Sequence, residues 1–276
     1  MSILKTMYFP NKEFASKEAM FSEFRENFNS LIDLKKAEIQ KSCEKGVAVT
    51  CKSLELLKFQ DQLKALNIDS NYYYVAVNTT GILDSHSDLH VENLWNKSIK
   101  EQQGNNYLVA DHELCIDNVI VKKEYIEMFV AKLPFALLGK NYAGDTQALI
   151  YKFPKNKVIH EKAKQWLESG DQIEASVRMQ YVTIDFAMDS NAPQDATEKQ
   201  RYDENINNIA NKADFEYIPY FFVVKEAKNV RESSLVVFGS NPVTGNINSV
   251  EPEKSTFEID PPASSQQIKS FYSNFI

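Results

Sequence analysis

The sequence predicts an α+β protein, with helices towards its N-terminal end and strands through most of its middle. Large apolar residues recur every three or four positions between residues 16 and 42, which is the period of an amphipathic helix. From Asn71 the chain becomes aromatic and β-branched, beginning with NYYYVAVNTTGI, which is typical of strands. With 276 residues, the chain is long enough for one large core or two smaller ones.

The elements follow in chain order from their periodicity and their flanking residues. Ser16 can cap the first helix, which either packs on the core, the more common case, or docks on a partner. Gly170 stands where a helix C-terminus favours glycine. We expect further helices at 53–67, 123–132 and 157–169, and strands at 71–82, 106–110, 147–153, 172–186, 216–225 and 232–238.

Two polar stretches interrupt this pattern. Residues 187–214 contain few large apolar groups, so we expect a long excursion that buries little. From Asn241 the chain is rich in Ser, Pro, Asn and acidic residues, as in a tail or linker. We therefore divide the chain into an N-terminal helical extension (1–70), a domain that carries the candidate site (71–243) and an acidic, polar tail (244–276).

Composition excludes several function classes. The net charge is −7 and the lysines are interleaved with acidic residues, so no basic stripe for nucleic acid is present. No glycine-rich phosphate-binding motif occurs. Three cysteines, an odd and sparse count, indicate reduced thiols in a cytosol. No apolar stretch approaches the length of a membrane span, so we expect an intracellular protein that does not contact membranes.

The strand QIEASVRMQYV carries the best nucleophile candidate. Its residues alternate between apolar and polar, so Ser176 and Arg178 fall on the same polar face. A serine hydroxyl becomes reactive when a base takes its proton and a donor stabilises the oxyanion, and the Arg178 guanidinium is such a donor. The ordinary interpretation is a solvated strand serine, which is far more common.

The four histidines offer few candidates for a general base. His160 lies on a helix surface, whereas His112 follows the end of an apolar strand. His86 and His90, beside Asp84 and Asp88, suggest a metal site completed by His112 or Cys115. Their stretch carries turn residues, however, so the regular structure that would place a histidine pair four residues apart on one face is not expected there. Cys115, so near His112 in sequence, is expected to be a buried thiol.

Four motifs in order carry a family resemblance: ILDSHSD, LVADHE, IEASVRMQYV and VRESSLVVFGSNP. Over roughly residues 72 to 243 the chain resembles the prohead (capsid maturation) protease family of tailed phages, which shares the herpesvirus assemblin fold. The matching positions are Asp84, Asp88, His112, Ser176-Val177, Glu232, Ser234-Leu235-Val236 and Asn241-Pro242. The chain departs from the family where Ser87 and Arg178 replace glycines, Ser233 replaces an apolar residue and Gly239-Ser240 replaces Pro-Ala.

The resemblance implies a fold and a set of roles. The fold would be a mainly antiparallel β-barrel of assemblin type with surrounding helices. Ser176 would be the nucleophile, His112 its general base and Glu232 the carboxylate that orients the imidazole. Arg178 would help to organise the oxyanion site.

The function implied is a serine endopeptidase that processes scaffold and capsid proteins inside the immature phage head, in the bacterial host cytoplasm. Capsid and scaffold proteins would be its substrates, self-association is compatible with this role, and no cofactor, nucleic acid or membrane is implied. Two alternatives stay open. One is a catalytically inactive protein that keeps the fold for capsid assembly. The other is a metal-dependent hydrolase that uses His86, His90 and His112.

Overall fold

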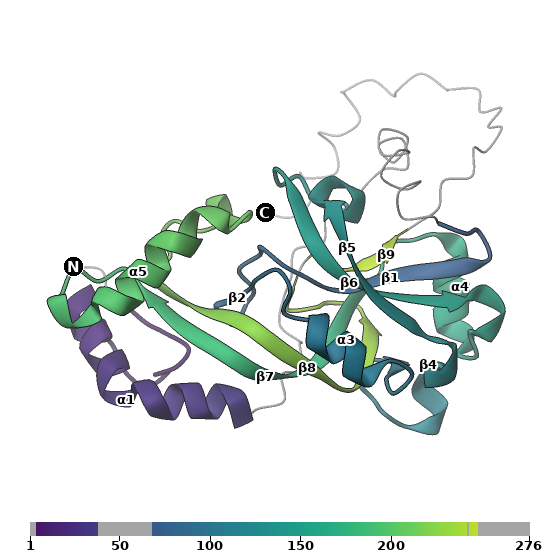
Figure 1. The fold of residues 1–276 in the computed structure, drawn as a ribbon, viewed down its shortest axis with the longest axis horizontal. Coiled ribbons are helices and arrows are strands. Elements are labelled where there is room, and N and C mark those ends of the chain that lie inside the picture. Colours follow the sequence, from purple (N-terminus) through teal and green to yellow (C-terminus); the bar gives the residue numbers. More distant parts are fainter. Residues whose placement is uncertain (1–3, 38–67, 242, 248–276) are drawn as a thin grey trace, which may run out of the picture.

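The computed structural model describes residues 4–37, 68–241 and 243–247, and over these residues it is an α+β fold with an N-terminal helix and two open sheets (Figure 1). The helix expected at 53–67, two of the three cysteines (Cys43 and Cys51) and most of the polar tail lie outside the described residues.

The first sheet is antiparallel and four-stranded. Its order is β5 (Glu127–Pro134), β6 (Asp145–Pro154), β1 (Tyr72–Thr79) and β9 (Gly245–Ile247). The strands expected near 71–82 and 147–153 are therefore present. The helix expected at 123–132 is wrong: a 3-10 turn is followed by β5, which pairs with β6 along its whole length. In this ladder the backbone N–H and C=O groups of β5 form hydrogen bonds with β6, instead of the hydrogen bonds that they would form with one another in a helix.

The second sheet is mixed and is built on one long strand. β8 (Tyr220–Val236) pairs on one edge with β2 (Asp88–His90) and then with β3 (Tyr107–Ala110), both parallel to it. Its other edge pairs antiparallel with β7 (Glu174–Met188), and β4 (Val119–Val121) extends the sheet beyond β3. The two strands expected at 216–225 and 232–238 thus belong to one 17-residue strand.

A closed barrel is not formed by the strands in the described part of the chain. Where β7 approaches β9, side chains replace the ladder that closure would need. The Ala175 N–H donates to Thr244 Oγ1 (3.0 Å), which donates in turn to the Ala175 carbonyl (2.6 Å). The Ile173 N–H donates to Asn246 Oδ1 (3.3 Å). Side chains thus fill the hydrogen-bonding groups of the backbone at this edge, where a paired strand would otherwise do so. The two sheets therefore stay separate.

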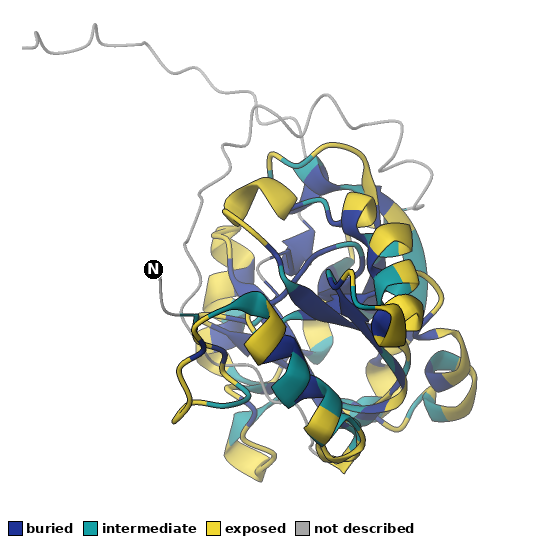
Figure 2. Cartoon of the chain, turned by 90° about the vertical axis from the view of Figure 1, so that its left-hand side faces the viewer, coloured by how far each residue is buried: buried dark blue, intermediate teal, exposed yellow. Residues whose placement is uncertain are grey.

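Helices cover the sheets, and the first one belongs to the core. α1 (Lys17–Ala37) packs on the β7–β8 ribbon, with the Phe24 ring 4.5 Å from Tyr220 and 5.1 Å from Phe186 between centroids. Figure 2 shows exposed residues on the outer faces of the helices and buried residues on the strands between them. The described chain also contains α3 (Asn96–Gln102), α4 (Glu161–Ser169), α5 (Ala196–Asn205) and 3-10 turns at Ile116–Asn118, Lys123–Tyr125, Phe135–Leu138, Lys155–Lys157, Pro193–Asp195, Ile206–Asn208 and Lys212–Asp214.

The polar segment 187–214 buries more than its composition suggests. Tyr202, Ile206 and Ile209 are buried in a cluster with Phe221 and Val223 of β8. A few well-spaced apolar residues are enough to seat α5 on the sheet, because the other side of the helix can stay polar. The expectation that this segment buries little is therefore wrong.

Candidate functional site

The topology brings the three proposed triad residues together on neighbouring strands. β8 lies between β7 and β3, and Ser234 of β8 is paired with Ser176 of β7 on one side and with Val109 of β3 on the other. Residues paired directly across a ladder point to the same face, as do residues two apart on one strand. Ser176 therefore shares a face with Glu232 and Ser234, and His112 is the second residue after the end of β3.

His112 bridges the other two residues. Its Nε2 lies 2.8 Å from Ser176 Oγ, and its Nδ1 lies 2.9 Å from Glu232 Oε1. An ionised carboxylate only accepts hydrogen bonds, so Nδ1 carries the proton. Nε2 is then the free acceptor for the Ser176 hydroxyl. This is the arrangement by which an imidazole removes a proton from a nucleophilic serine.

Glu232 is fully buried and its carboxylate is satisfied on both oxygens. Besides His112 Nδ1, Oε1 is 2.9 Å from Arg178 Nε, and Oε2 accepts from Ser234 Oγ (2.8 Å). Ser234 Oγ also accepts the backbone N–H of His112 (2.9 Å). A buried carboxylate stays ionised only where charge and hydrogen bonds replace water, and these contacts do so.

The backbone holds His112 in an uncommon conformation. Asp111 and His112 have φ values of +52° and +59°, although neither is glycine. The Asp111 N–H still donates to the Leu235 carbonyl (3.1 Å), so the turn begins directly at the end of the parallel β3–β8 ladder. Left-handed non-glycine residues persist where the surroundings fix them, and they concentrate at functional sites. This turn directs the imidazole back towards β7.

Arg178 contacts both the carboxylate of Glu232 and the backbone of His112. Its Nε pairs with Glu232, and its Nη2 donates to the His112 carbonyl (3.0 Å). A bulge between Val177 and Met179 in the pairing with β8 accompanies this placement. Both contacts stabilise the acid and the base of the proposed triad. An oxyanion role for Arg178 stays a prediction.

The site is closed. Ser176 is 5% exposed and His112 is 7% exposed, so the face expected to be solvated is covered. Beside Ser176 lies a cavity of about 10 Å³, lined among others by Asp84, His86, Met179 and Asn241. That volume is room for about one water molecule. An extended substrate therefore has to displace part of this wall before it reaches Ser176.

A buried polar cluster forms part of the same wall. Lys35 of α1 makes an ion pair with Asp88, whose Oδ2 accepts from the Tyr181 hydroxyl (2.7 Å). The Lys35 ammonium lies 4.3 Å from the centre of the Phe222 ring and also donates to the His86 carbonyl (3.4 Å). The N-terminal helix thus holds the 84–88 turn, which supplies two residues of the cavity beside Ser176.

Burial shifts the protonation of two groups in and beside this cluster. It raises the pKa of Asp84 to about 8, and the nearby Asp88 carboxylate adds to the rise. It lowers the pKa of His90 to about 4, against the opposing attraction of Asp88. His90 Nδ1 lies 3.0 Å from Asn78 Nδ2 and its Nε2 lies 3.3 Å from the Tyr181 hydroxyl. His90 is thus a neutral, hydrogen-bonded core residue.

The other sequence candidates do not gather at one point. His86 lies in the 84–88 turn, and His160 is the N-cap of α4, where its Nδ1 accepts from the Ala163 N–H (3.2 Å). Within the described ranges, no three His, Cys, Asp or Glu side chains are arranged to hold a metal ion. Cys115 is exposed, so the buried thiol expected from its sequence position is wrong. It lies in the loop after His112, outside the sheet.

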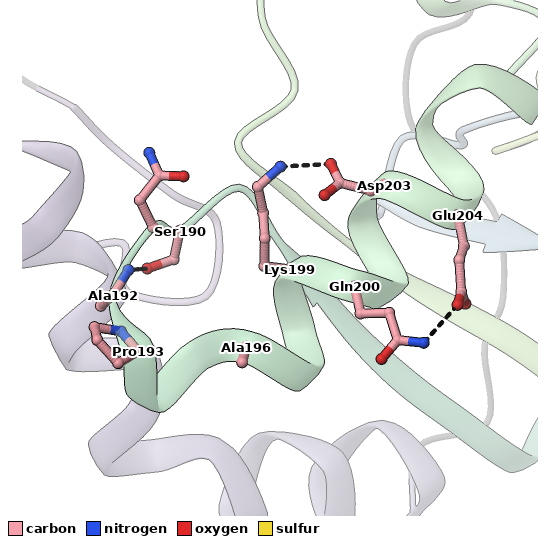
Figure 3. A pocket seen from close by; sticks show the side chains of 9 residues that line it. Ser190, Ala192, Pro193, Ala196, Lys199, Gln200, Asp203 and Glu204 are labelled. Atoms are coloured by element: carbon pink, nitrogen blue, oxygen red, sulfur yellow. Dashed lines mark hydrogen bonds and ion pairs between the residues drawn. The ribbon is translucent and has the colours of Figure 1, made fainter.

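A second, larger cavity lies far from Ser176. It measures about 640 Å³ and runs along α5, with Pro193, Lys199 and Glu204 among its lining residues (Figure 3). Its lining begins just after β7 ends, and twelve residues of extended strand separate Ser176 from Met188, or about 40 Å. Lys199 pairs with Asp203, and Gln200 donates to Glu204 (2.8 Å). This cavity is too distant to hold a substrate against the proposed nucleophile.

The sequence suggests no individual role for two contributors to the site. Ser234 belongs to one of the four motifs, and its position two residues after Glu232 on a strand places both on one face. Lys35 belongs to a lysine-rich stretch typical of a solvated helix surface, and no local signal distinguishes it. No helix in the described ranges has the length and apolar character needed to cross a membrane.

Comparisons with known proteins identify no relative. No protein-family model matches the chain, and neither the curated proteins nor the solved structures include a significant match.

Proposed function

We propose that this protein is a serine hydrolase in which Ser176, His112 and Glu232 act as a catalytic triad. The observation that carries the proposal is the unbroken hydrogen-bonded chain from Ser176 Oγ through the imidazole to Glu232. The three residues are separated by 64 and 56 positions, because 176 − 112 = 64 and 232 − 176 = 56. Side chains so distant in sequence meet in this geometry and order of roles in serine hydrolases of unrelated folds.

The chemistry follows from the geometry. His112 Nε2 takes the Ser176 proton as Oγ attacks a substrate carbonyl, and Glu232 stabilises the imidazolium that forms. The same Nε2 then gives the proton to the leaving amine, which leaves an acyl group on Ser176. Water, deprotonated by His112, hydrolyses this ester and restores the serine. Arg178 and Ser234 position Glu232 and the backbone of His112 throughout.

Within this class, we propose a serine endopeptidase of the prohead protease type, which processes scaffold and capsid proteins during phage head maturation. The order of the four motifs supports this assignment, as does the convergence of their His, Ser and Glu residues. Under the same proposal, the two sheets are the open counterpart of an assemblin-type barrel. The enzyme acts inside the immature head in the bacterial host.

The edge of β7 beside Ser176 suggests how a protein substrate binds. Thr244 and Asn246 satisfy the backbone groups of Ala175 and Ile173 through side chains. An extended substrate backbone can replace these bonds and add a strand to β7. The scissile carbonyl of the substrate would then lie beside Ser176. Displacement of the Thr244 and Asn246 side chains from the edge of β7 would also open the buried site to the substrate.

A fluorophosphonate probe tests the proposal, because it phosphonylates activated serines, with loss of fluoride, without requiring a known substrate. We expect modification of Ser176, identified by mass spectrometry, and no modification of Ser176→Ala. Failure of the wild-type protein to react, in the presence of a reactive control protease, would favour the inactive assembly protein. Cleavage of co-expressed scaffold and capsid proteins by the wild type, and not by Ser176→Ala, tests the particular substrate class.

A further inference from the structure

A groove of about 870 Å³ lies directly beyond the loop that carries His112. Leu114, Cys115 and Ile116 form one wall, and Ile159 and Val119 contribute others. Ile116 is 91% exposed, Ile159 is 55% exposed and Leu114 is 40% exposed. Isolated exposed apolar residues are ordinary, but several gathered in one groove mark a surface that binds another segment.

The same groove carries three cations that make no ion pair with another described residue. Lys122, Lys123 and Arg231 line it, with Glu124 as the one acidic lining residue. Within the described ranges, none of these three cations forms an ion pair, whereas nine other lysines do (Lys5, Lys12, Lys17, Lys35, Lys97, Lys132, Lys152, Lys199 and Lys225). In a chain of net charge −7, three such cations around an apolar groove favour an acidic, apolar segment.

Arg231 is fixed in this position by the fold. Its φ is +71°, a left-handed conformation that is uncommon for a residue other than glycine. It lies where the pairing of β8 with β7 is irregular, between Asn229 and Ser233. The bulge at this point directs the Arg231 side chain to the groove, while Glu232, the next residue, enters the triad.

The chain itself contains a segment of the required chemistry. Residues 250–260 read VEPEKSTFEID, in which four carboxylates (Glu251, Glu253, Glu258 and Asp260) alternate with Val250, Phe257 and Ile259, and Lys254 is the one base. The last residue of this segment, Asp260, lies 13 residues after Ile247, since 260 − 247 = 13. At about 3.3 Å per extended residue this stretch spans about 43 Å. A compact chain of this size has a radius of gyration of about 19 Å, so the segment can reach surface at more than twice that distance from Ile247.

We infer that the groove formed by the 114–116 loop, Lys122, Lys123 and Arg231 is a docking site for the chain's own acidic segment 250–260. Carboxylates of the segment pair with the cations, and Phe257 and Ile259 cover Leu114 and Ile116. The segment is then held beside the loop of the proposed general base. Docking requires no catalysis, so it is tested separately from the proposed function.

Alkylation of Cys115 measures occupancy of the groove. In a full-length Ser176→Ala, Cys43→Ser, Cys51→Ser background, Cys115 is the one remaining thiol, and it is exposed in the structure. With a local segment concentration near the millimolar range and a tenfold lower dissociation constant, docking slows alkylation by N-ethylmaleimide about tenfold. We expect Glu258→Lys with Asp260→Lys, which changes the tail alone, to abolish this protection.

A charge exchange makes the test specific. Lys122→Glu with Lys123→Glu should also abolish protection, although negative charge beside a thiol disfavours the thiolate and by itself slows alkylation. Combining both pairs of substitutions should restore it. The matched control is Lys100→Glu with Lys228→Glu, two exposed lysines without ion pairs in the described ranges, which should leave the rate unchanged.

Three results would overturn the inference. The first is an alkylation rate that does not respond to the tail substitutions. The second is a charge exchange that fails to restore protection. The third is protection that increases with protein concentration, which would assign the groove to a second copy of the chain.

Discussion

Replacing Glu232 with glutamine tests whether the buried carboxylate supports His112 as a base. The substitution keeps the shape of the side chain and removes its charge, while Oε1 can remain an acceptor for His112 Nδ1. Glu232 is fully buried and lies 2.9 Å from that nitrogen. The charge matters most when the imidazole is protonated, because the carboxylate and the imidazolium then attract each other.

The magnitude follows from Coulomb's law. Two unit charges about 4 Å apart in a medium of effective dielectric constant about 20 attract by about 4 kcal/mol. Arg178 pairs with the same carboxylate and offsets part of this attraction, so we expect a loss of about 2–4 kcal/mol. That corresponds to a decrease of about 30- to 1,000-fold in rate. The effect should be smaller than that of His112→Ala, which removes the base itself.

The assay is the second-order rate of fluorophosphonate labelling at Ser176, measured at one fixed pH for every variant. Glu226→Gln is the matched control, since Glu226 lies on the same strand and pairs with Lys97 at the surface (3.2 Å). Labelling of Glu232→Gln within twofold of wild type would refute the role of Glu232.

Three further measurements test the site and its surroundings. Ser176→Ala should prevent labelling and change the free energy of unfolding by about 1 kcal/mol, the value of one hydrogen bond, in urea titrations; a loss of several kcal/mol would indicate a mainly structural serine. Lys35→Met should cost about 3–5 kcal/mol by the same method, because it leaves Asp88 charged and buried, whereas Lys36→Met should have little effect; equal effects would contradict this. Asp84, with a pKa raised to about 8 from an ordinary 3.8, keeps its proton in the folded state after the unfolded state has lost it, so stability should fall as pH rises towards 8. The lowered pKa of His90 opposes this trend below pH 6.5, so the decrease in unfolding free energy should appear between pH 6.5 and 8. It should reach at most about 1.4 kcal/mol per pH unit. An unfolding free energy that stays constant over this range would exclude the raised pKa of Asp84.

The elements with a clear period could be predicted, and those set by long-range pairing could not. The alternation in QIEASVRMQYV predicted β7 and placed Ser176 and Arg178 on one face, where Ser176 contacts His112 and Arg178 contacts Glu232. By contrast, residues 123–132 carry a helical pattern, and their pairing with β6 overrides it. Segment 187–214 shows that average composition also misleads, because three apolar residues at suitable positions bury it against β8.

The order of the motifs suggested His112, Ser176 and Glu232 as site residues, but it did not predict how the fold brings them into contact. That geometry depends on β3 lying parallel to β8 and on two consecutive left-handed residues at Asp111 and His112. Parallel pairing of distant segments leaves no local signal, and left-handed conformation at Asp or His is uncommon. The role of Lys35 in holding the 84–88 turn could not be predicted from the sequence either. A lysine in a lysine-rich helical stretch has the same local sequence pattern whether it is buried or solvated.

The polar residues along one face of β7 are best interpreted as a group. A strand with alternating polarity is normally half solvated, yet here the polar face is covered as well. Its residues must therefore find partners within the protein. Glu174 accepts from the Gly239 N–H (2.7 Å), Ser176 meets His112, Arg178 pairs with Glu232, and Gln180 donates to the Lys36 carbonyl (3.0 Å). On the neighbouring strand β8, Ser234 is paired with Ser176, and Glu232 lies two residues before it on the same face. When two paired strands carry small polar and charged residues at facing positions, they predict a buried polar network rather than a solvated surface. Under the proposed function, the hydrogen bonds that make the burial of Ser176 tolerable are the same ones that activate it.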